Sequence, residues 1–154
     1  MKKIDHIDKK ILALLQEDGR ITIKEMAAQL KMTTTPVFER TKKLEKAGII
    51  SHYAAVLNPD KLGKKLYSFA HISLKDHSKA LVDKFSEEII KIPEVLECHY
   101  VTGDSDFILK ILLNDMEKYR EFVMDSLFKM SNIAKVETFL SLSVSKNSHA
   151  IPLD

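Results

Sequence analysis

The sequence has few glycines and prolines, a single cysteine and no long apolar run. Its 154 residues include only 4 glycines and 4 prolines, which leaves little room for a low-complexity or linker segment. Cys98 is the only cysteine, so no disulfide can form within the chain, and we expect a reducing, cytoplasmic setting. No apolar run approaches the roughly 20 residues that span a bilayer. Asp5 and Asp8 would interrupt a signal-peptide core, so we expect no membrane partner.

Patterns of catalytic and metal sites are also lacking. The sequence shows no evident Ser-His-Asp arrangement, no pair of catalytic carboxylates and no glycine-rich phosphate loop. Its six histidines are not spaced as metal ligands are. We therefore expect a protein that is not an enzyme and has no catalytic residue, no metal and no cofactor.

Charge is distributed unevenly along the chain. Residues 1–65 contain 14 Lys and Arg against 8 Asp and Glu, a net charge of +6, whereas residues 66–154 contain 10 against 14, a net charge of −4. A basic half joined to an acidic half suggests that only the first half meets a polyanion. Basic surface is also common on proteins that bind no nucleic acid, so charge alone leaves both interpretations open.

Short helices are expected in the first fifty residues. Apolar residues at helical spacing predict a first helix over residues 5–17. Thr22 and Glu25 form a capping box, which opens a second helix that stops near Lys31. After a third helix, residues 49–57 are expected to form a strand.

The third helix has the features of a DNA recognition helix. Thr33 is a favourable N-cap, Pro36 fits the first turn, and Gly48 ends the helix. Two short helices in close succession, the second opening with hydroxyl residues and carrying basic ones, match the helix-turn-helix layout. Hydroxyl groups in the first turn can reach base edges, and Lys and Arg further along bind phosphates. The candidate DNA contacts are Thr33, Thr34, Thr35, Phe38, Glu39, Arg40, Lys42 and Lys43.

Two structural alternatives stay open for this segment. Arg40 could form an ion pair with Glu39 or Asp8 instead of binding DNA. The three helices could also be a packing module whose charged face is merely solvated.

The last ninety residues show a strand-helix-strand-strand-helix-strand pattern. The expected strands are 66–74, 95–101, 107–113 and 136–144, and the expected helices are 78–92 and 116–130. This order is the split βαβ, or ferredoxin-like, arrangement. The fold class is therefore α+β, with an N-terminal three-helix (winged) helix-turn-helix followed by a ferredoxin-like βαββαβ sensor domain.

Aromatic residues on the predicted strands suggest a dimer interface. A ferredoxin-like sheet carries its two helices on one face and leaves the other free for a partner. Phe69, Tyr100, Phe107 and Phe139 are candidates for that free face. The alternative is that all of them lie under the helices, but the strands are too apolar on both sides to favour it.

The turn between the two central strands carries a possible ligand site. As a hairpin turn, residues 102–106 are unremarkable, because Gly, Asp and Ser are usual there. Alternatively, exposed backbone amides around Gly103 could hold a carboxylate, and Asp106 could pair with an ammonium group. These are the two charges of a free amino acid.

Taken together, these segments resemble the leucine-responsive and asparagine-responsive regulators, the Lrp/AsnC family. The likeness covers nearly the whole chain and is closest to the leucine-responsive branch. It is carried by Ile4-Asp5, Asp8, Ile11-Leu12, Asp18-Gly19-Arg20-Ile21, Thr33-Thr34-Thr35-Pro36, Glu39-Arg40, Leu44-Glu45, Gly48-Ile49-Ile50, Leu57-Asn58-Pro59 and residues 97–106. The three threonines depart from the family, where serine is commoner, and the tail after Lys146 matches poorly.

The resemblance implies a transcription regulator that binds double-stranded DNA and responds to an amino acid. It implies homodimers paired through the C-terminal domains, often assembled into an octamer. The expected domains are a helix-turn-helix over 1–50, a connecting strand and hinge over 51–65, and an effector-binding and oligomerisation domain over 66–154. The implied effector site consists of Tyr100, Val101, Thr102, Gly103, Asp104, Asp106 and Thr138. An architectural protein that wraps DNA without an effector stays open as an alternative.

Overall fold

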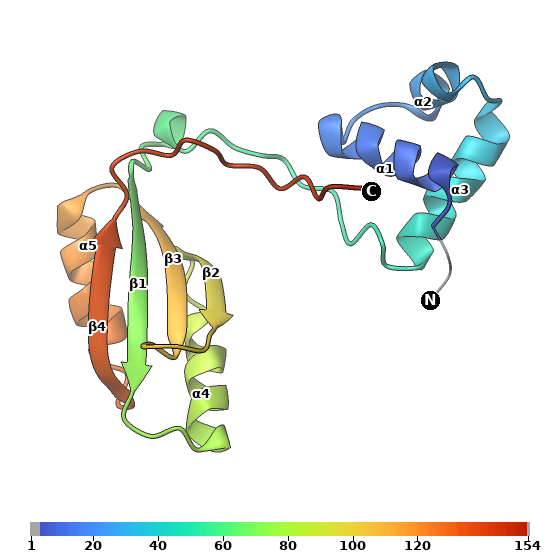
Figure 1. Cartoon of the computed structure of the whole chain (residues 1–154). Coiled ribbons are helices and arrows are strands. Elements are labelled where there is room, and N and C mark those ends of the chain that lie inside the picture. The colour runs from blue at the N-terminus through green and yellow to red at the C-terminus, as the bar shows by residue number, and fades with distance from the viewer. Residues whose placement is uncertain (1–3, 154) are drawn as a thin grey trace. The chain divides into compact units, whose positions relative to one another are not determined.

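The computed structural model describes residues 4–153, and these fall into two compact units (Figure 1). The first unit comprises residues 4–56 and 146–153, and the second comprises residues 57–145. The tail 146–153, which the sequence placed with the second domain, groups with the first unit. The reason is a pair of hydrogen bonds: Gln16 Nε2 donates to the Ile151 carbonyl at 3.1 Å, and the Ile151 amide donates to Gln16 Oε1 at 2.6 Å.

Three helices form the first unit, close to the expected bounds. They are α1 (His6–Glu17), α2 (Ile23–Leu30) and α3 (Thr34–Lys46). The predicted capping box of α2 is confirmed, because the Thr22 hydroxyl accepts from the Glu25 amide and Glu25 accepts from the Thr22 amide. Such a box satisfies two amides that the helix itself cannot pair.

Apolar side chains from all three helices meet in one core. Its buried members are Ile11, Leu12, Met26, Ala27, Val37 and Leu44. Thr41 joins this buried stripe of α3, and its hydroxyl donates to the Val37 carbonyl one turn earlier at 2.9 Å. The outer side of α3 is thereby left to polar and charged residues.

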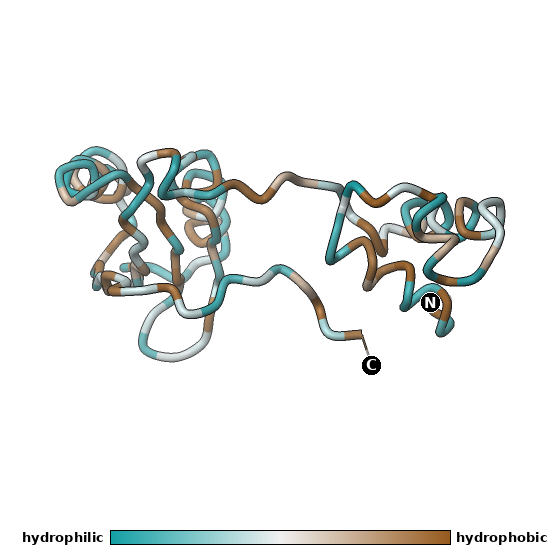
Figure 2. Tube along the Cα trace, turned by 90° about the horizontal axis from the view of Figure 1, so that it is seen from above, coloured by the Kyte–Doolittle hydropathy of each residue, from teal (hydrophilic) through white to brown (hydrophobic). Residues whose placement is uncertain are grey.

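The expected strand over residues 49–57 is not formed. Gly48 ends α3 with a positive φ of 70°, as its position predicted, but the segment after it is extended without a hydrogen-bonded partner strand among residues 4–153. Val56 and Leu57 are largely exposed, and Figure 2 shows hydrophobic residues along this connection. A strand needs a neighbour for its backbone groups, so an apolar pattern alone cannot make one.

The second unit has the predicted ferredoxin-like order. After a short 3-10 turn η1 (Asp60–Leu62), its elements are β1 (Leu66–Leu74), α4 (Lys79–Ile89), β2 (Val95–Tyr100), β3 (Phe107–Leu113), α5 (Met116–Phe122), the π-helical segment η2 (Val123–Leu127) and β4 (Ile133–Leu140). The strands lie in the order β2-β3-β1-β4 and all pairings are antiparallel. Figure 1 shows α4 and α5 on the same side of this sheet.

Some element bounds differ from the prediction. The last strand covers 133–140 rather than 136–144, because its pairing with β1 sets where it begins and ends. The second long helix is split, with α5 continuing into the wider turn of η2. The described residues include no helix long and apolar enough to cross a membrane.

The two faces of the sheet have different roles. Alternate residues of the central strands β1 and β3 face α4 and α5 and are buried, and they form the core with Phe85, Ile89, Phe122 and Leu127 from the helices and η2. We call the opposite side the open face. It is defined by Phe69, His71, Glu97, His99, Ile108, Lys110, Glu137 and Phe139, which alternate with the core residues.

Candidate functional site

The start of α3 offers free hydroxyl groups. Thr33 occupies the N-cap position as expected, but its side chain makes no capping hydrogen bond. Thr33, Thr34 and Thr35 are all exposed. A helix start with unoccupied hydroxyls and amides can donate to base edges and phosphates.

The outer side of α3 is exposed and carries mixed charge. Phe38, Glu39, Lys42 and Lys43 all face solvent. Lys42 pairs with Glu45 at 2.7 Å, and its ammonium nitrogen lies 5.9 Å from the centre of the Phe38 ring. Within the described part of the chain, no ion pair holds Lys43. Lys43 is therefore the cation of this group that is most available to a phosphate.

Arg40 is held inside the first unit. Its Nη1 lies 2.6 Å from Asp5 Oδ2 and 2.7 Å from Asp8 Oδ1, so the ion-pair alternative is the one observed. The pKa of the Asp5 carboxyl is lowered, first by the hydrogen bond from the Asp8 amide and then by the Arg40 guanidinium. Arg40 thus links the recognition helix candidate to the first turn of α1. The sequence had suggested Asp8 or Glu39 as partner and missed Asp5, although an Asp before a helix is itself a capping signal.

The turn between β2 and β3 presents unpaired backbone donors. The amides of Thr102, Gly103, Asp104 and Ser105 donate to no residue that the structure describes. Gly103 has a φ of 126°, which L side chains rarely adopt, and nothing lies within 4 Å of where a Cβ would be. Four free amides in a row at an open turn form a group that can receive an anion such as a carboxylate.

Asp106 lies at the end of this turn and is firmly placed. Its Oδ2 accepts from the Leu74 amide at 2.7 Å, and both of its oxygens lie near His77 Nε2, at 3.0 and 3.1 Å. The sequence selected Asp106 but missed Leu74, at the end of β1, and His77, in the loop after it, which lie about thirty residues earlier. No local pattern in the sequence signals such a contact.

The other predicted effector residues are only partly brought together. Tyr100 and Val101 lead directly into the turn, and Asp104 is exposed within it. Thr138 lies elsewhere, because it pairs with Ala70 in the middle of the sheet and its hydroxyl shares a short hydrogen bond with that of Tyr119 from α5. A single chain therefore does not place Thr138 beside the turn.

The open face of the sheet carries part of the predicted dimer surface. Phe69 and Phe139 are cross-strand neighbours there and are both exposed, and the His71 ring lies 4.9 Å from that of Phe139. Tyr100 and Phe107 were wrongly assigned to this face. Phe107 is buried in the core between the rings of Tyr100 and Phe85, because the register of β3 turns it toward the helices.

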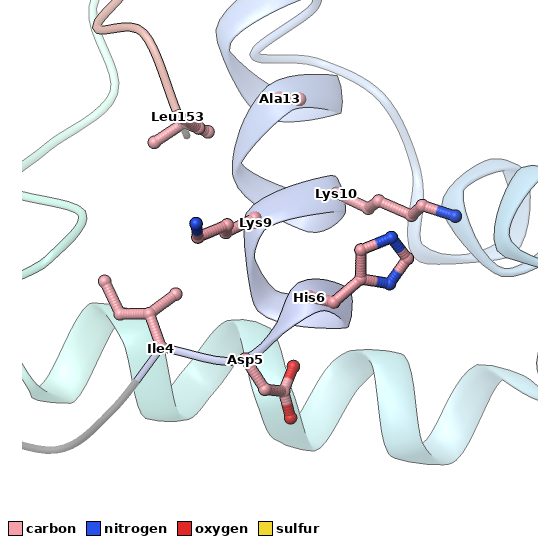
Figure 3. A pocket seen from close by; sticks show the side chains of 7 residues that line it. All are labelled: Ile4, Asp5, His6, Lys9, Lys10, Ala13 and Leu153. Carbon is pink, nitrogen blue, oxygen red and sulfur yellow. The ribbon is translucent and has the colours of Figure 1, made fainter.

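One hollow of the first unit lies along α1. It has a volume of about 510 Å³ and is lined by Ile4, Asp5, His6, Lys9, Lys10, Ala13 and Leu153 (Figure 3). Leu153 of the tail forms one wall, which continues the contact between Gln16 and Ile151. Residues 4–153 include no group of three or more His, Cys, Asp or Glu side chains that could hold a metal ion, in this hollow or elsewhere.

Comparisons with known proteins match both units. A family model described as Lrp/AsnC ligand binding domain matches residues 68–151, and one described as winged helix-turn-helix DNA-binding matches residues 4–51. Together with the fold, these matches define the class of protein: a DNA-binding transcriptional regulator with a ligand-binding domain.

Whole-length relatives support the same class. The chain is 36% identical over 151 residues to the transcriptional regulator AzlB of Bacillus subtilis, covering 98% of this chain and 96% of that protein. It is 34% identical over 150 residues to the leucine-responsive regulatory protein of Escherichia coli K12, covering 97% and 92%. The chain belongs to the Lrp/AsnC family of transcriptional regulators.

Solved structures show the same fold. A transcriptional regulator of Neisseria meningitidis, crystallised in complex with L-Met, matches with a TM-score of 0.94 and 33% identity over 99% of this chain and 98% of that one. An AsnC family regulator of Agrobacterium tumefaciens matches with a TM-score of 0.92 and 31% identity, covering 96% of both chains.

Proposed function

We propose that this regulator binds a free amino acid at the turn after β2 and changes its DNA binding in response. One observation carries the proposal: the unpaired amides of Thr102 to Ser105 lie next to the fixed carboxylate of Asp106. The amides suit the carboxylate of an amino acid, and Asp106 suits its ammonium group. The L-Met complex of the Neisseria regulator supports an amino acid as the class of effector.

On the DNA side, α3 enters the major groove with its first turn. Thr34, Thr35 and Phe38 face the base edges, while Lys42 and Lys43 approach the phosphates. Arg40 acts by holding α3 against α1 rather than by touching DNA, since both of its carboxylate partners come from the start of α1. Because phosphate contacts release counterions, DNA affinity falls steeply with salt.

The protein works as a homodimer, with octamers as a further assembly. The open face supplies the pairing surface, since Phe69 and Phe139 are exposed aromatic side chains that are cross-strand neighbours on it. Effector binding favours one assembly over another and so alters which α3 helices reach DNA together. A regulator of transcription acts where the DNA is, and we place this one in the cytoplasm.

The effector site is tested by a matched pair of glycine substitutions. Gly103→Ala forces a side chain onto a φ of 126° and so redirects the free amides, whereas Gly63→Ala introduces a milder backbone strain, at a φ of 72°, outside the turn. Calorimetry with L-methionine is expected to show binding for the wild type and Gly63→Ala and at least tenfold weaker binding for Gly103→Ala. Equal affinity in all three proteins would contradict the site.

The second candidate is an effector-independent architectural protein, favoured by the basic first half of the chain. It is tested by titrating the full chain with each of the twenty amino acids. Absence of heat and of any change in mass by light scattering, together with retained DNA binding, would favour this candidate over the first.

A further inference from the structure

The Asp106 carboxylate has one backbone partner and one side-chain partner, and His77 Nε2 lies near both of its oxygens. Oδ2 accepts the Leu74 amide at 2.7 Å, a bond to the backbone of β1. Oδ1 has the His77 imidazole at 3.0 Å as its only partner among the described residues. The Asp106 backbone is fixed as well, because its amide donates to Ile72 and its carbonyl accepts from Val101, both at 2.8 Å. The position of Asp106 therefore does not depend on His77.

The His77 side chain is free to rotate away from the Asp106 carboxylate. Its side chain is 60% exposed, against 19% for Asp106. The loop that carries it is anchored separately: the Lys75 amide donates to the Asn132 carbonyl at 2.8 Å, and the Asp76 amide donates to Asn132 Oδ1 at 3.1 Å. Rotation of the His77 side chain would uncover Oδ1 without disturbing these backbone contacts.

We propose that His77 is a specificity-determining residue that occupies Oδ1 of Asp106 until the ammonium group of an amino acid displaces it. This inference rests on the proposed effector site. A charged ammonium makes a stronger hydrogen bond to a carboxylate than a neutral donor does, so it can replace the imidazole. A hydroxy acid has only a neutral hydroxyl at the same position and cannot. His77 therefore sets a small threshold that favours amino acids over their hydroxy analogues at Asp106.

The size of the threshold follows from the exposure of the pair. Exposed ion pairs typically contribute about 0.2–1 kcal/mol, so removing the competitor strengthens ammonium binding by about 1.4- to fivefold. A residue that positioned Asp106 for the effector would have the opposite sign, because its removal would weaken binding. The direction of the change thus separates a competitor from a positioning residue.

Calorimetry on the full-length protein tests the inference with L-methionine and its hydroxy analogue, 2-hydroxy-4-(methylthio)butanoate. His77→Ala is expected to bind L-methionine about 1.4- to fivefold more tightly than the wild type, and to bind the hydroxy analogue more tightly by no more than the same factor. His77→Gln keeps a donor and should resemble the wild type. Lys79→Ala is the control, because Lys79 is an exposed cation of α4 that pairs with a carboxylate, Asp83, at 2.6 Å, outside the turn and the open face.

Each outcome decides something. Weaker or unchanged L-methionine binding in His77→Ala, with binding intact in the wild type, overturns the role of His77 and leaves the proposed function standing. The same gain in Lys79→Ala as in His77→Ala also overturns it. If neither the wild type nor His77→Ala binds any amino acid, the proposed effector site fails as well. Binding by His77→Ala alone would support a threshold higher than the exposed pair suggests.

Discussion

Two cations one turn apart on α3 have different surroundings, and single substitutions should separate their roles. Lys43 is exposed without an ion pair among the described residues, whereas Arg40 bridges Asp5 and Asp8. We expect Lys43→Ala to weaken binding to all DNA sequences and to reduce the salt slope by about one unit, with an unchanged melting temperature. Arg40→Ala should lower the melting temperature by a few degrees, because two carboxylates lose their partner.

Salt-dependent mobility shifts and thermal unfolding measure both effects. If Arg40→Ala changed the salt slope as Lys43→Ala does and left the melting temperature unaltered, Arg40 would be a DNA contact after all.

Asp5 makes the stability of the first unit depend on pH in the acidic range. The pKa of its carboxyl is lowered in the folded chain, chiefly by the Asp8 amide and then by Arg40. A lowered pKa in the folded chain means that the ionised carboxylate stabilises the fold. This contribution is complete above about pH 4, the pKa range of a free Asp. It is lost as the pH falls through the lower pKa of the folded chain. Asp5→Asn should flatten the loss of stability below pH 4. Denaturant titrations at pH 3 and pH 6 would measure the free energy of unfolding of both proteins. The change in this free energy between the two pH values should be smaller for Asp5→Asn than for the wild type.

Lys31 is the residue of the helix-turn-helix with backbone strain. Its φ of 53° is the one positive value for a non-glycine residue in the described chain. Because glycine adopts this conformation without steric cost, Lys31→Gly should stabilise the DNA-free protein by about 0.5–1 kcal/mol. Lys10→Gly, inside α1, should destabilise it by about 1 kcal/mol, since glycine is a poor helix former. If denaturant unfolding showed that both substitutions change the free energy of unfolding in the same direction, strain at Lys31 would be ruled out.

At the scale of elements, the sequence predicted those whose signals are local. The capping box of Thr22 and Glu25 and the alternation along 66–74 are each written in consecutive residues, and the corresponding α2 and β1 form as expected. The segment 49–57 shows the limit of such reasoning, because an apolar run becomes a strand only if another strand lies beside it. The bounds of β4 were missed for the same reason.

The candidate effector site shows the same division. The turn itself was found from its Gly, Asp and Ser residues, which are near each other in sequence. The contacts of Asp106 with Leu74 and His77 were not, since they span 32 and 29 residues and depend on how β1 and β3 pair. Likewise, Phe107 was placed on the wrong face because alternation does not say which face the helices cover.

The tail after the sheet contacts the first unit, whereas the sequence analysis placed it with the second domain. The side-chain amide of Gln16 pairs with both backbone groups of Ile151, much as a neighbouring strand would. Gln16→Ala should therefore release the tail, and the Ile151 amide should lose its protection from hydrogen exchange. Gln29→Ala, an equally solvent-facing glutamine in α2, should leave that protection intact. A fast-exchanging Ile151 amide in the wild type would contradict the contact.

For the molecule as a whole, the unequal charge of the two halves assigns them different partners. A net charge of +6 in residues 1–65 attracts a polyanion, and a net charge of −4 in residues 66–154 repels it. We therefore expect the later half of the chain to meet other copies of itself, or small ligands, more readily than DNA. The open face of the sheet in this half offers two exposed aromatic side chains, Phe69 and Phe139, for such a contact.

A single aromatic substitution should test whether the open face joins two copies. In a dimer with twofold symmetry each residue of the interface counts twice, so losing about 2 kcal/mol of burial at Phe139 in each copy weakens the dimer about a thousandfold. Phe139→Asp should therefore shift the mass measured by light scattering toward that of one 17.6 kDa chain. Phe128→Asp is the control, because Phe128 is 60% exposed, against 50% for Phe139, but follows η2 outside the open face. If Phe128→Asp dissociated the assembly and Phe139→Asp did not, the copies would meet through the helical side of the sheet, and an effector at the turn would act on a different interface.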